Sequence, residues 1–426
     1  MKELKELSSN GFIEISSLDI EYNLMNLNQL VFEVTDACNL RCKYCGYADL
    51  YEGYDERENL KFPFYKAKLI IDYLYEYWKR GYCEDVINPV SIGFYGGEPL
   101  LNVPFIQEVI DYIESLAPIG KKFHYSMTTN AMLLDKYMDF LVEKEFRLLI
   151  SLDGDEKGQS YRVDAKGRNS FDKVFANIQL LRSKYPEYFG RFVMFNSVLH
   201  NRNEVESIYH FIKNEFGKEP SIAPLNNSGI REDKIEEFYK TYQNITESIQ
   251  KSTNCEALKN ELFIKGPETS MLLDYVHNHS GNVFYGYNDL LYDKKHISFP
   301  PSGTCIPFSK KMFVTVKGRI LQCERINHEF ALGEVTDDGV ELNLESAARQ
   351  HNEYAFKYIT QCKTCARKRA CVQCIYQIDD IHDEKSKCSS YCSAKQYEKL
   401  NEYCMDYLDK HPELYKRILK EVVVRG

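Results

Sequence analysis

The chain has 426 residues, of which 44% are hydrophobic and 27% are charged. These are the proportions of a globular protein with one large or two to three ordinary domains, and they exclude a disordered chain and a membrane bundle. The 54 basic and 63 acidic residues leave a formal net charge of −9, and no basic block interrupts the sequence. The charge balance therefore argues against a nucleic-acid partner.

The cysteine content is the unusual part of the composition. The chain starts MKELKELSSNGFIEIS, which lacks the apolar segment and cleavage site of a signal peptide, and it contains no run long and apolar enough to span a bilayer. We therefore expect a cytoplasmic protein with no membrane partner. Because a reducing compartment does not sustain disulfides, the 14 cysteines indicate metal or redox chemistry.

Six short apolar runs alternate with helical patterns between about Gln29 and Leu225. The runs are Leu30–Val34, Ile92–Tyr95, Phe123–Met127, Leu148–Leu152, Phe192–Val198 and Ile222–Leu225. The segments between them place apolar residues at helical spacing, for example at Ile106, Val109, Ile110 and Ile113. This alternation predicts an α/β fold whose parallel strands curl into a partial barrel, with its chemistry at the carboxyl ends of the strands.

Changes in composition and hydrophobic pattern divide the chain into five expected segments. These are an N-terminal extension at 1–28 that alternates as a small hairpin would, a core at 29–230, a helical bridging segment at 231–300, a cysteine-rich α+β domain at 301–404 and a C-terminal helix at 405–426. Nine of the 14 cysteines fall from Cys305 to Cys404. Cys83 and Cys255 are isolated and Cys404 lies in a helical pattern, and a small buried apolar residue is the better interpretation of all three.

Three cysteines follow the first predicted strand at once. Cys38, Cys42 and Cys45 are spaced so that one loop can wrap a compact centre, and soft sulfur ligands select zinc, Cu(I) or iron–sulfur clusters. Three ligands leave a fourth metal position open, which is typical of a catalytic site. The alternatives are a zinc loop that borrows a ligand from elsewhere and a group of structural cysteines.

Polar groups follow three further strands. The second strand runs into Gly96–Pro99, the third into Thr128–Asn130 and the fourth into Ser151–Gly154, with Arg162 and Arg168 a short way on. Paired glycines allow a ligand to approach the backbone, and the carboxylate, hydroxyl, amide and guanidinium groups suit an ammonium, a ribose and a carboxylate. Taken singly, each segment is also an ordinary turn or helix cap.

Together these motifs resemble the radical S-adenosylmethionine (radical SAM) superfamily over about residues 29–225. The resemblance implies that Cys38, Cys42 and Cys45 hold three irons of a catalytic 4Fe–4S cluster, whose fourth iron binds the amino and carboxylate groups of S-adenosylmethionine. It also implies a set of cofactor contacts. These are Tyr44 on the adenine side, Gly96, Gly97 and Glu98 at the amino group, Asn130, Ser151 at the ribose, and Arg162 at the carboxylate with Arg168 as its rival.

The later cysteines resemble the SPASM extension of that superfamily, which carries two auxiliary 4Fe–4S clusters. The resemblance assigns Cys305, Cys323 and Cys374 to an inner cluster and Cys362, Cys365, Cys371 and Cys392 to an outer one. The spacing before Cys374 is one residue shorter than the family pattern, and Cys388 is additional. Cys388 completes the inner cluster, replaces Cys392 or stays free, and in the last case the inner cluster keeps an open iron. A pair of zinc sites is the alternative.

The chemistry implied by the resemblance is hydrogen abstraction by a 5′-deoxyadenosyl radical, followed by loss of an electron to an auxiliary cluster. The first hypothesis is a maturase that installs a thioether or carbon–carbon cross-link in a ribosomally made precursor peptide, with a ferredoxin or flavodoxin as electron donor. The second is a sulfatase-type maturase that forms formylglycine. The third, of another class, is a non-catalytic zinc-bound scaffold.

Overall fold

The computed structural model describes residues 14–81, 89–263, 266–280, 303–368 and 371–421. It divides into two compact units. The sheet unit comprises Ile15–Ser248 and Cys305–Gln350, and the helical unit comprises Met1–Glu14, Ile249–Thr304 and His351–Gly426. No helix in the described ranges has the length and apolar character needed to cross a bilayer.

The sheet unit is built on one ten-stranded sheet with the order β10-β9-β8-β7-β1-β2-β3-β4-β5-β6. The strands are β1 (Gln29–Thr35), β2 (Val90–Gly96), β3 (Phe123–Thr129), β4 (Arg147–Ser151), β5 (Val193–Leu199), β6 (Ser221–Pro224), β7 (Met312–Val314), β8 (Arg319–Leu321), β9 (Gly333–Val335) and β10 (Val340–Leu342). Strands β1 to β6 are parallel neighbours in chain order, β7 joins β1 in parallel, and β8 to β10 continue antiparallel. The predicted parallel α/β sheet is confirmed, and all six strands predicted in it lie within two residues of the observed ends.

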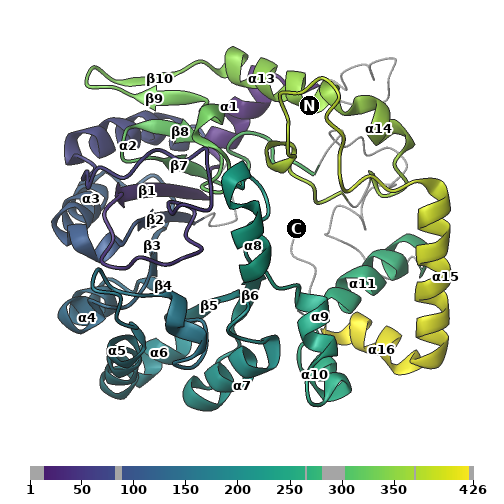
Figure 1. The fold of residues 1–426 in the computed structure, drawn as a ribbon. Coiled ribbons are helices and arrows are strands. Elements are labelled where there is room, and N and C mark those ends of the chain that lie inside the picture. Colours follow the sequence, from purple (N-terminus) through teal and green to yellow (C-terminus); the bar gives the residue numbers. More distant parts are fainter. Residues whose placement is uncertain (1–13, 82–88, 264–265, 281–302, 369–370, 422–426) are drawn as a thin grey trace. The chain divides into compact units, whose positions relative to one another are not determined.

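Helices run along the outer side of the parallel strands in Figure 1. They are α2 (Phe64–Trp78), α3 (Val103–Ser115), α4 (Leu134–Glu143), α5 (Phe171–Lys184), α6 (Pro186–Phe192) and α7 (Val205–Phe216). Helix α3 shows why they form, because its apolar residues Phe105, Ile106, Val109 and Ile113 recur on one face and are all buried. Short 3-10 turns follow several strands and loops, at η1 (Pro99–Asn102), η2 (Gly158–Tyr161), η3 (Glu232–Lys234) and η6 (His328–Phe330).

The N-terminal hairpin is a wrong prediction for the residues described, because Ser17–Met25 form helix α1. The side chain of Asp19 accepts hydrogen bonds from the backbone and hydroxyl of Ser16, at 2.8 and 2.7 Å, and so fixes the start of a helix. The apparent alternation arose because Leu18 and Tyr22 are apolar but exposed, while Ile20 alone of the three is buried. Residues 1–13 lie outside the described ranges.

The helical unit contains α10 (Cys255–Glu261), α11 (Pro267–Ser280), α14 (Ile359–Thr364), the turn η8 (Ile375–Gln377), α15 (Ala394–Lys410) and α16 (Pro412–Glu421). The chain passes between the units within α9 (Ile245–Gln250) and α13 (Leu344–Lys357), and α8 (Ile235–Thr241) precedes α9 in the sheet unit. A small core joins α11, α15 and α16 through Leu272, Val276, Cys404 and Ile418. Cys404 is fully buried there, as its apolar interpretation predicts, whereas Cys255 is only partly buried and Cys83 lies outside the described residues.

Candidate active site

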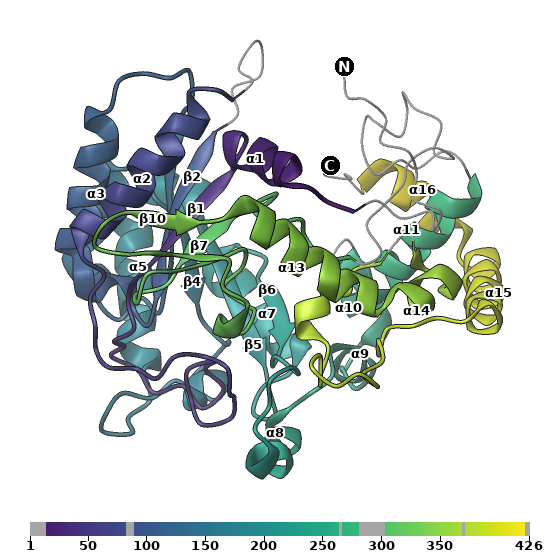
Figure 2. The ribbon, with the colours of Figure 1, turned by 90° about the horizontal axis from the view of Figure 1, so that it is seen from above.

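The loop from Asp36 to Pro63, which we call the cluster loop, leaves the carboxyl end of β1 and carries the three clustered cysteines. In Figure 2 this dark purple loop projects beyond the strand ends on the side where α8 lies. Cys38, Cys42 and Cys45 line one cavity of about 430 Å³, together with Arg57 and Tyr47 of the same loop. In the described ranges no three His, Cys, Asp or Glu side chains are placed to hold one metal ion. The three thiols instead face a space of the size that holds a cofactor, and soft sulfur donors suit an iron–sulfur cluster.

Each of these thiols has a polar neighbour. The Cys38 sulfur accepts hydrogen bonds from the Leu40 N–H at 3.4 Å and from Asn130 Nδ2 at 3.7 Å. Arg162 Nη1 lies 4.0 Å from the Cys42 sulfur, and Arg57 Nη2 lies 3.2 Å from the Cys45 sulfur. Burial raises the pKa of the Cys42 thiol to about 12 and raises that of Cys38, so binding a metal must release these protons.

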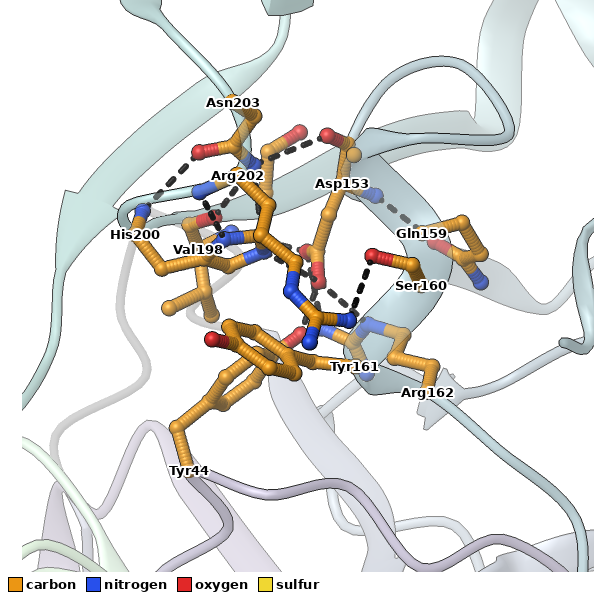
Figure 3. A network of polar contacts seen from close by, with 12 residues as sticks. Tyr44, Asp153, Gln159, Ser160, Tyr161, Arg162, Val198, His200, Arg202 and Asn203 are labelled. Atoms are coloured by element: carbon orange, nitrogen blue, oxygen red, sulfur yellow. Dashed lines mark hydrogen bonds and ion pairs between the residues drawn. The ribbon is translucent and has the colours of Figure 1, made fainter. Parts of the chain in front are cut away.

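A buried carboxylate organises the ends of β4 and β5 (Figure 3). Asp153, which follows β4, is fully buried and forms a bidentate ion pair with Arg162, at 2.8 Å to Nε and 3.1 Å to Nη2. It also accepts hydrogen bonds from the Val198 N–H at 2.9 Å and from the Tyr44 hydroxyl. Asp153 therefore ties the cluster loop to two strands of the sheet through Tyr44.

An imidazole completes this network in Figure 3. The ring of His200 stacks on Tyr44 with centroids 5.5 Å apart, and its Nδ1 accepts a hydrogen bond from the Arg202 N–H at 3.2 Å. His200 is fully buried, and this burial lowers its pKa to about 4, so the ring is neutral at neutral pH. Asn203 donates to the carbonyls of Asp153 and Val198, each at 3.0 Å, which fixes the loop that follows β5.

The structure separates the two arginines that the sequence placed at the cofactor carboxylate. Arg162 is buried, and its third nitrogen faces the sulfur of Cys42. Arg168 instead forms an exposed pair with Asp164 and does not join the network. Ser151 ends β4 in register with Asn196 and is buried. The roles of Tyr44, Ser151 and Arg162 at the cofactor remain predictions.

The two-glycine turn packs against the start of the cluster loop. The Gly97 N–H donates to the Thr35 carbonyl at 2.8 Å, and the Glu98 N–H donates to the Ala37 carbonyl at 2.9 Å. A Cβ at Gly96 would lie 2.2 Å from the Thr35 oxygen, and one at Gly97 would lie 2.1 Å from the Ala37 oxygen, so both positions require glycine. The turn therefore fixes where the cluster loop begins.

The carboxylate of Glu98 points inward rather than into the cavity of the three cysteines. It accepts hydrogen bonds from the Thr129 hydroxyl at 2.7 Å, the Asn130 N–H at 2.8 Å and the Leu100 N–H at 3.2 Å, and burial raises its pKa to about 7. Asn130 in turn donates to Asn39 Oδ1 at 2.7 Å and to the Cys38 sulfur. Glu98 thus holds Asn130 against the cluster loop, and its contact with the cofactor remains a prediction.

Sequence reasoning missed Arg57, Tyr47 and Glu33, which belong to no motif. The Arg57 guanidinium lies 4.8 Å above the centre of the Tyr47 ring, and the Tyr47 hydroxyl donates to Glu33 on β1. The Val316 N–H donates to the other oxygen of Glu33 at 2.8 Å. Burial raises the pKa of Glu33 to about 7. The one available signal was a glutamate within an otherwise apolar strand.

Two cysteines assigned to the inner cluster also belong to the sheet unit. The Cys305 carbonyl accepts a hydrogen bond from Gln322, and Cys323 follows β8. Beside Cys323, Glu324 forms an ion pair with Lys311 at 3.0 Å. Burial acts to raise the pKa of Glu324, but the Lys311 ammonium, a backbone hydrogen bond and the Arg325 charge together outweigh it and hold that pKa below its usual value. Glu324 is therefore a carboxylate at neutral pH.

The remaining assigned cysteines lie in the helical unit. Burial, followed by the nearby thiols of Cys371, Cys388 and Cys365, raises the pKa of Cys362 to about 12. Gln361 accepts the Cys388 N–H at 3.0 Å, and the Cys392 carbonyl accepts the Ala366 N–H at 2.9 Å. The structure therefore brings Cys388 beside the outer set, and Cys374 precedes η8 in the same unit. Their roles as ligands remain predictions.

Comparisons with known proteins agree with this arrangement. Residues 32–212 match the model of the radical SAM superfamily. The chain is 29% identical over 211 residues to a cysteine-type anaerobic sulfatase-maturating enzyme of Clostridium novyi (strain NT), a match that covers 48% of this chain and 54% of that protein. It is 23% identical over 400 residues to a protein of the same name from Clostridium perfringens (strain ATCC 13124), covering 90% of this chain and 97% of the relative.

A solved structure has the same fold. It is described as native anSMEcpe with bound AdoMet and Cp18Cys peptide, has a TM-score of 0.59 at 19% identity, and the match covers 92% of this chain and 99% of that one. The likeness therefore extends past the strands of the sheet unit into the cysteine-rich part of the sequence.

Proposed function

Because residues 32–212 form a radical SAM domain, we propose that this enzyme is a maturase that oxidises a cysteine or serine side chain of a peptide or protein to formylglycine. The observation that carries the proposal is the extent of the likeness to the sulfatase-maturating enzyme of Clostridium perfringens. That likeness covers 90% of this chain and 97% of the relative.

The radical SAM family implies a 4Fe–4S cluster and S-adenosylmethionine, and the cavity at Cys38, Cys42 and Cys45 fits such a group. When bound and reduced, they supply a 5′-deoxyadenosyl radical that removes a hydrogen atom from unactivated carbon. The three cysteines hold the cluster in this proposal. The Asp153 network fixes Tyr44 and Arg162 at one side of the cysteine loop, and Asn130 fixes Cys38 at the other.

Oxidation of a cysteine requires the substrate to lose a hydrogen atom from Cβ, one electron and the thiol proton. The resulting thioaldehyde takes up water, releases hydrogen sulfide and becomes the aldehyde of formylglycine. We assign the proton to Glu324, a carboxylate that Lys311 holds in place beside Cys323. In this proposal the electron would pass to an auxiliary 4Fe–4S cluster that Cys305 and Cys323 would help to hold, and a second auxiliary cluster would take Cys362, Cys365 and Cys371 with Cys388 or Cys392.

A cross-linking maturase of a precursor peptide is the second candidate. The inner auxiliary cluster favours this candidate, because its three assigned cysteines leave one iron to which a substrate thiolate could bind. In either case the partners are a peptide substrate and a reducing donor such as ferredoxin or flavodoxin, and we place the reaction in the cytoplasm. The long match to sulfatase-maturating enzymes leads us to rank formylglycine formation first.

The test is to incubate the reconstituted enzyme anaerobically with reductant, S-adenosylmethionine and matched peptides that carry cysteine, serine or alanine at one position. Formylglycine from cysteine exchanges sulfur for oxygen with loss of two hydrogens, and the product reacts with a hydrazide. A cross-link also loses two hydrogens but keeps all its sulfur and gives no hydrazide adduct. Stoichiometric zinc without iron–sulfur absorbance in anaerobically isolated protein would overturn both and favour the scaffold.

A further inference from the structure

Three cationic or amide groups surround the cluster cysteines, and Arg57 differs from the others. Its Nη2 lies 3.2 Å from the Cys45 sulfur, which is the shortest of the side-chain contacts to these three sulfurs, and it lines the same cavity. Arg162 approaches Cys42 only at 4.0 Å, and two of its nitrogens are already bound to Asp153. The charge of Arg162 is therefore largely balanced before it reaches the sulfur.

The charge of Arg57 has no such counterpart. Within the described part of the chain no carboxylate pairs with Arg57, and its Nε is buried without a hydrogen-bond acceptor. What holds the guanidinium is the face of Tyr47, at 4.8 Å from the ring centre. Arg57 is half-buried, and a cation that is held by an aromatic face and pairs with no carboxylate keeps an attraction for an anion at its other edge. At that edge Nη2 lies 3.2 Å from the Cys45 sulfur, which would be a thiolate once it binds a metal.

The support behind Tyr47 reaches into the sheet. The Tyr47 hydroxyl donates to Glu33, and the second oxygen of Glu33 accepts the Val316 N–H at 2.8 Å. Glu33 is a residue of β1 and is only 1% exposed, so it offers a rigid anchor. The position of the guanidinium is thus set by the strand that leads into the cluster loop.

We propose that Arg57 is a positioning residue that donates a charge-assisted hydrogen bond to the Cys45 thiolate and raises the midpoint potential of the cluster in the radical SAM domain. Reduction adds a negative charge to the cluster, and a cation with an N–H···S contact stabilises the reduced form more than the oxidised form. Removal of Arg57 therefore makes the midpoint potential more negative. The inference rests on the cluster that the proposed function requires.

The test compares midpoint potentials by redox titration followed by electron paramagnetic resonance, using the full chain with its clusters reconstituted. The signal that changes when S-adenosylmethionine is added identifies the cluster of interest. Arg57→Met removes the charge and the donor, and Arg57→Lys keeps the charge but loses the planar fork over Tyr47. Lys234→Gln is the matched control, because Lys234 lines the same cavity but pairs with Glu237 at 3.3 Å instead of contacting sulfur.

We expect the most negative midpoint for Arg57→Met, an intermediate value for Arg57→Lys and the wild-type value for Lys234→Gln. A wild-type midpoint in Arg57→Met with full iron content overturns the proposal, and so does an equal shift in Lys234→Gln. If Arg57→Met does not assemble its cluster, Arg57→Lys and Tyr47→Leu carry the test, and wild-type midpoints in both overturn it. A wild-type protein that assembles no 4Fe–4S cluster would instead contradict the proposed function.

Discussion

Arg162 donates hydrogen bonds to both oxygens of Asp153, with Nε 2.8 Å from one and Nη2 3.1 Å from the other, and both residues are buried. Arg162 contacts the Cys42 sulfur, and Asp153 accepts hydrogen bonds from the Tyr44 hydroxyl and the Val198 N–H. The pair therefore connects the cluster loop to the ends of β4 and β5. The sheet therefore helps to hold the thiols of the cluster loop in place before a metal binds.

The first prediction is that Asp153→Asn destabilises the protein by about 3–5 kcal/mol, because it leaves the Arg162 charge buried without its partner. Urea unfolding of the protein under anaerobic conditions measures this change. Asp164→Asn is the control, since it breaks the exposed pair with Arg168 and should change stability little. Equal losses in the two variants would show that Asp153 is not an organising residue.

The second prediction separates two roles of Glu98. Glu98→Gln replaces one carboxylate oxygen by a donor facing the Thr129 hydroxyl or the Asn130 N–H, so stability should fall by about 1–3 kcal/mol. If the carboxylate also contacts the cofactor ammonium, affinity for S-adenosylmethionine should fall about ten- to a hundredfold. Unfolding curves and equilibrium binding measure the two effects separately. If stability falls but the affinity for S-adenosylmethionine is unchanged, Glu98 only positions Asn130 and does not contact the cofactor.

The third prediction concerns pH. The folded pKa of His200 is lowered to about 4, against about 6.5 when unfolded, so its contribution is fully present above pH 6.5 and is lost as the pH falls toward 4. The loss amounts to about 3 kcal/mol over this window. Glu33 and Glu98, whose pKa values are raised to about 7, act in the opposite direction, because the folded state then binds more protons.

The difference between wild type and His200→Asn isolates the histidine from these carboxyls. The free energy of unfolding of the wild type, minus that of the variant, should decrease as the pH is lowered from 6.5 to 4 and should be constant above 7. His351, also buried with a pKa lowered to about 4, is present in both proteins and cancels. A difference that does not vary with pH would show that the pKa of His200 is the same in the folded and unfolded protein.

Much of the fold followed from local pattern, and the site followed less completely. Apolar runs such as Leu148–Leu152 predicted the parallel strands, because buried strands leave a clear hydrophobic signal. The cysteine spacing led to the cavity because all three predicted ligands come from one loop. Arg57 gave no signal, since its meaning depends on Tyr47 and Glu33, which meet it only in the folded chain.

The choice between Arg162 and Arg168 shows the same limit. Spacing after the Ser151–Gly154 motif permits either residue at the cofactor carboxylate. The structure shows that Arg162 pairs with the buried Asp153 and Arg168 with Asp164, and which of them contacts the cofactor stays a prediction. Similarly, the residues at Leu18, Ile20 and Tyr22 fit a strand and a helix equally over a short span, and the contacts between Ser16 and Asp19 decide for the helix. Tertiary and capping contacts settle what periodicity leaves open.

The fourth prediction is the iron content. Reconstituted protein should carry about twelve irons, four for each of three clusters, and replacement of Cys38, Cys42 and Cys45 together by alanine should remove about one third of them. That variant should also lose all cleavage of S-adenosylmethionine, because we predict that the cofactor binds at the cluster held by these three cysteines. Iron and sulfide assays with chromatography of 5′-deoxyadenosine measure both effects. Residual cleavage in the triple variant would place the reactive cluster elsewhere.

The last prediction assigns the release of 5′-deoxyadenosine to the cluster loop and the later oxidation of the substrate to the cluster that Cys323 helps to hold. A radical on the substrate carbon must lose an electron before a closed-shell product forms, and we assign that electron to the inner auxiliary cluster. Cys323→Ala should therefore continue to release 5′-deoxyadenosine slowly while the yield of modified peptide falls to background. Glu324→Gln keeps the cysteine but removes the carboxylate beside it, so it should also release deoxyadenosine without product.

Chromatography of deoxyadenosine and mass spectrometry of the peptide, on the same anaerobic samples, check both variants. Lys317→Gln is the control, since Lys317 pairs with Glu58 at the surface and should leave the ratio of product to deoxyadenosine near the wild-type value. Full peptide modification by Cys323→Ala that has lost the inner cluster would refute the division. Full modification by Glu324→Gln alone would move the proton acceptor to another group and leave the electron path intact, because the two variants remove different parts of the same oxidation.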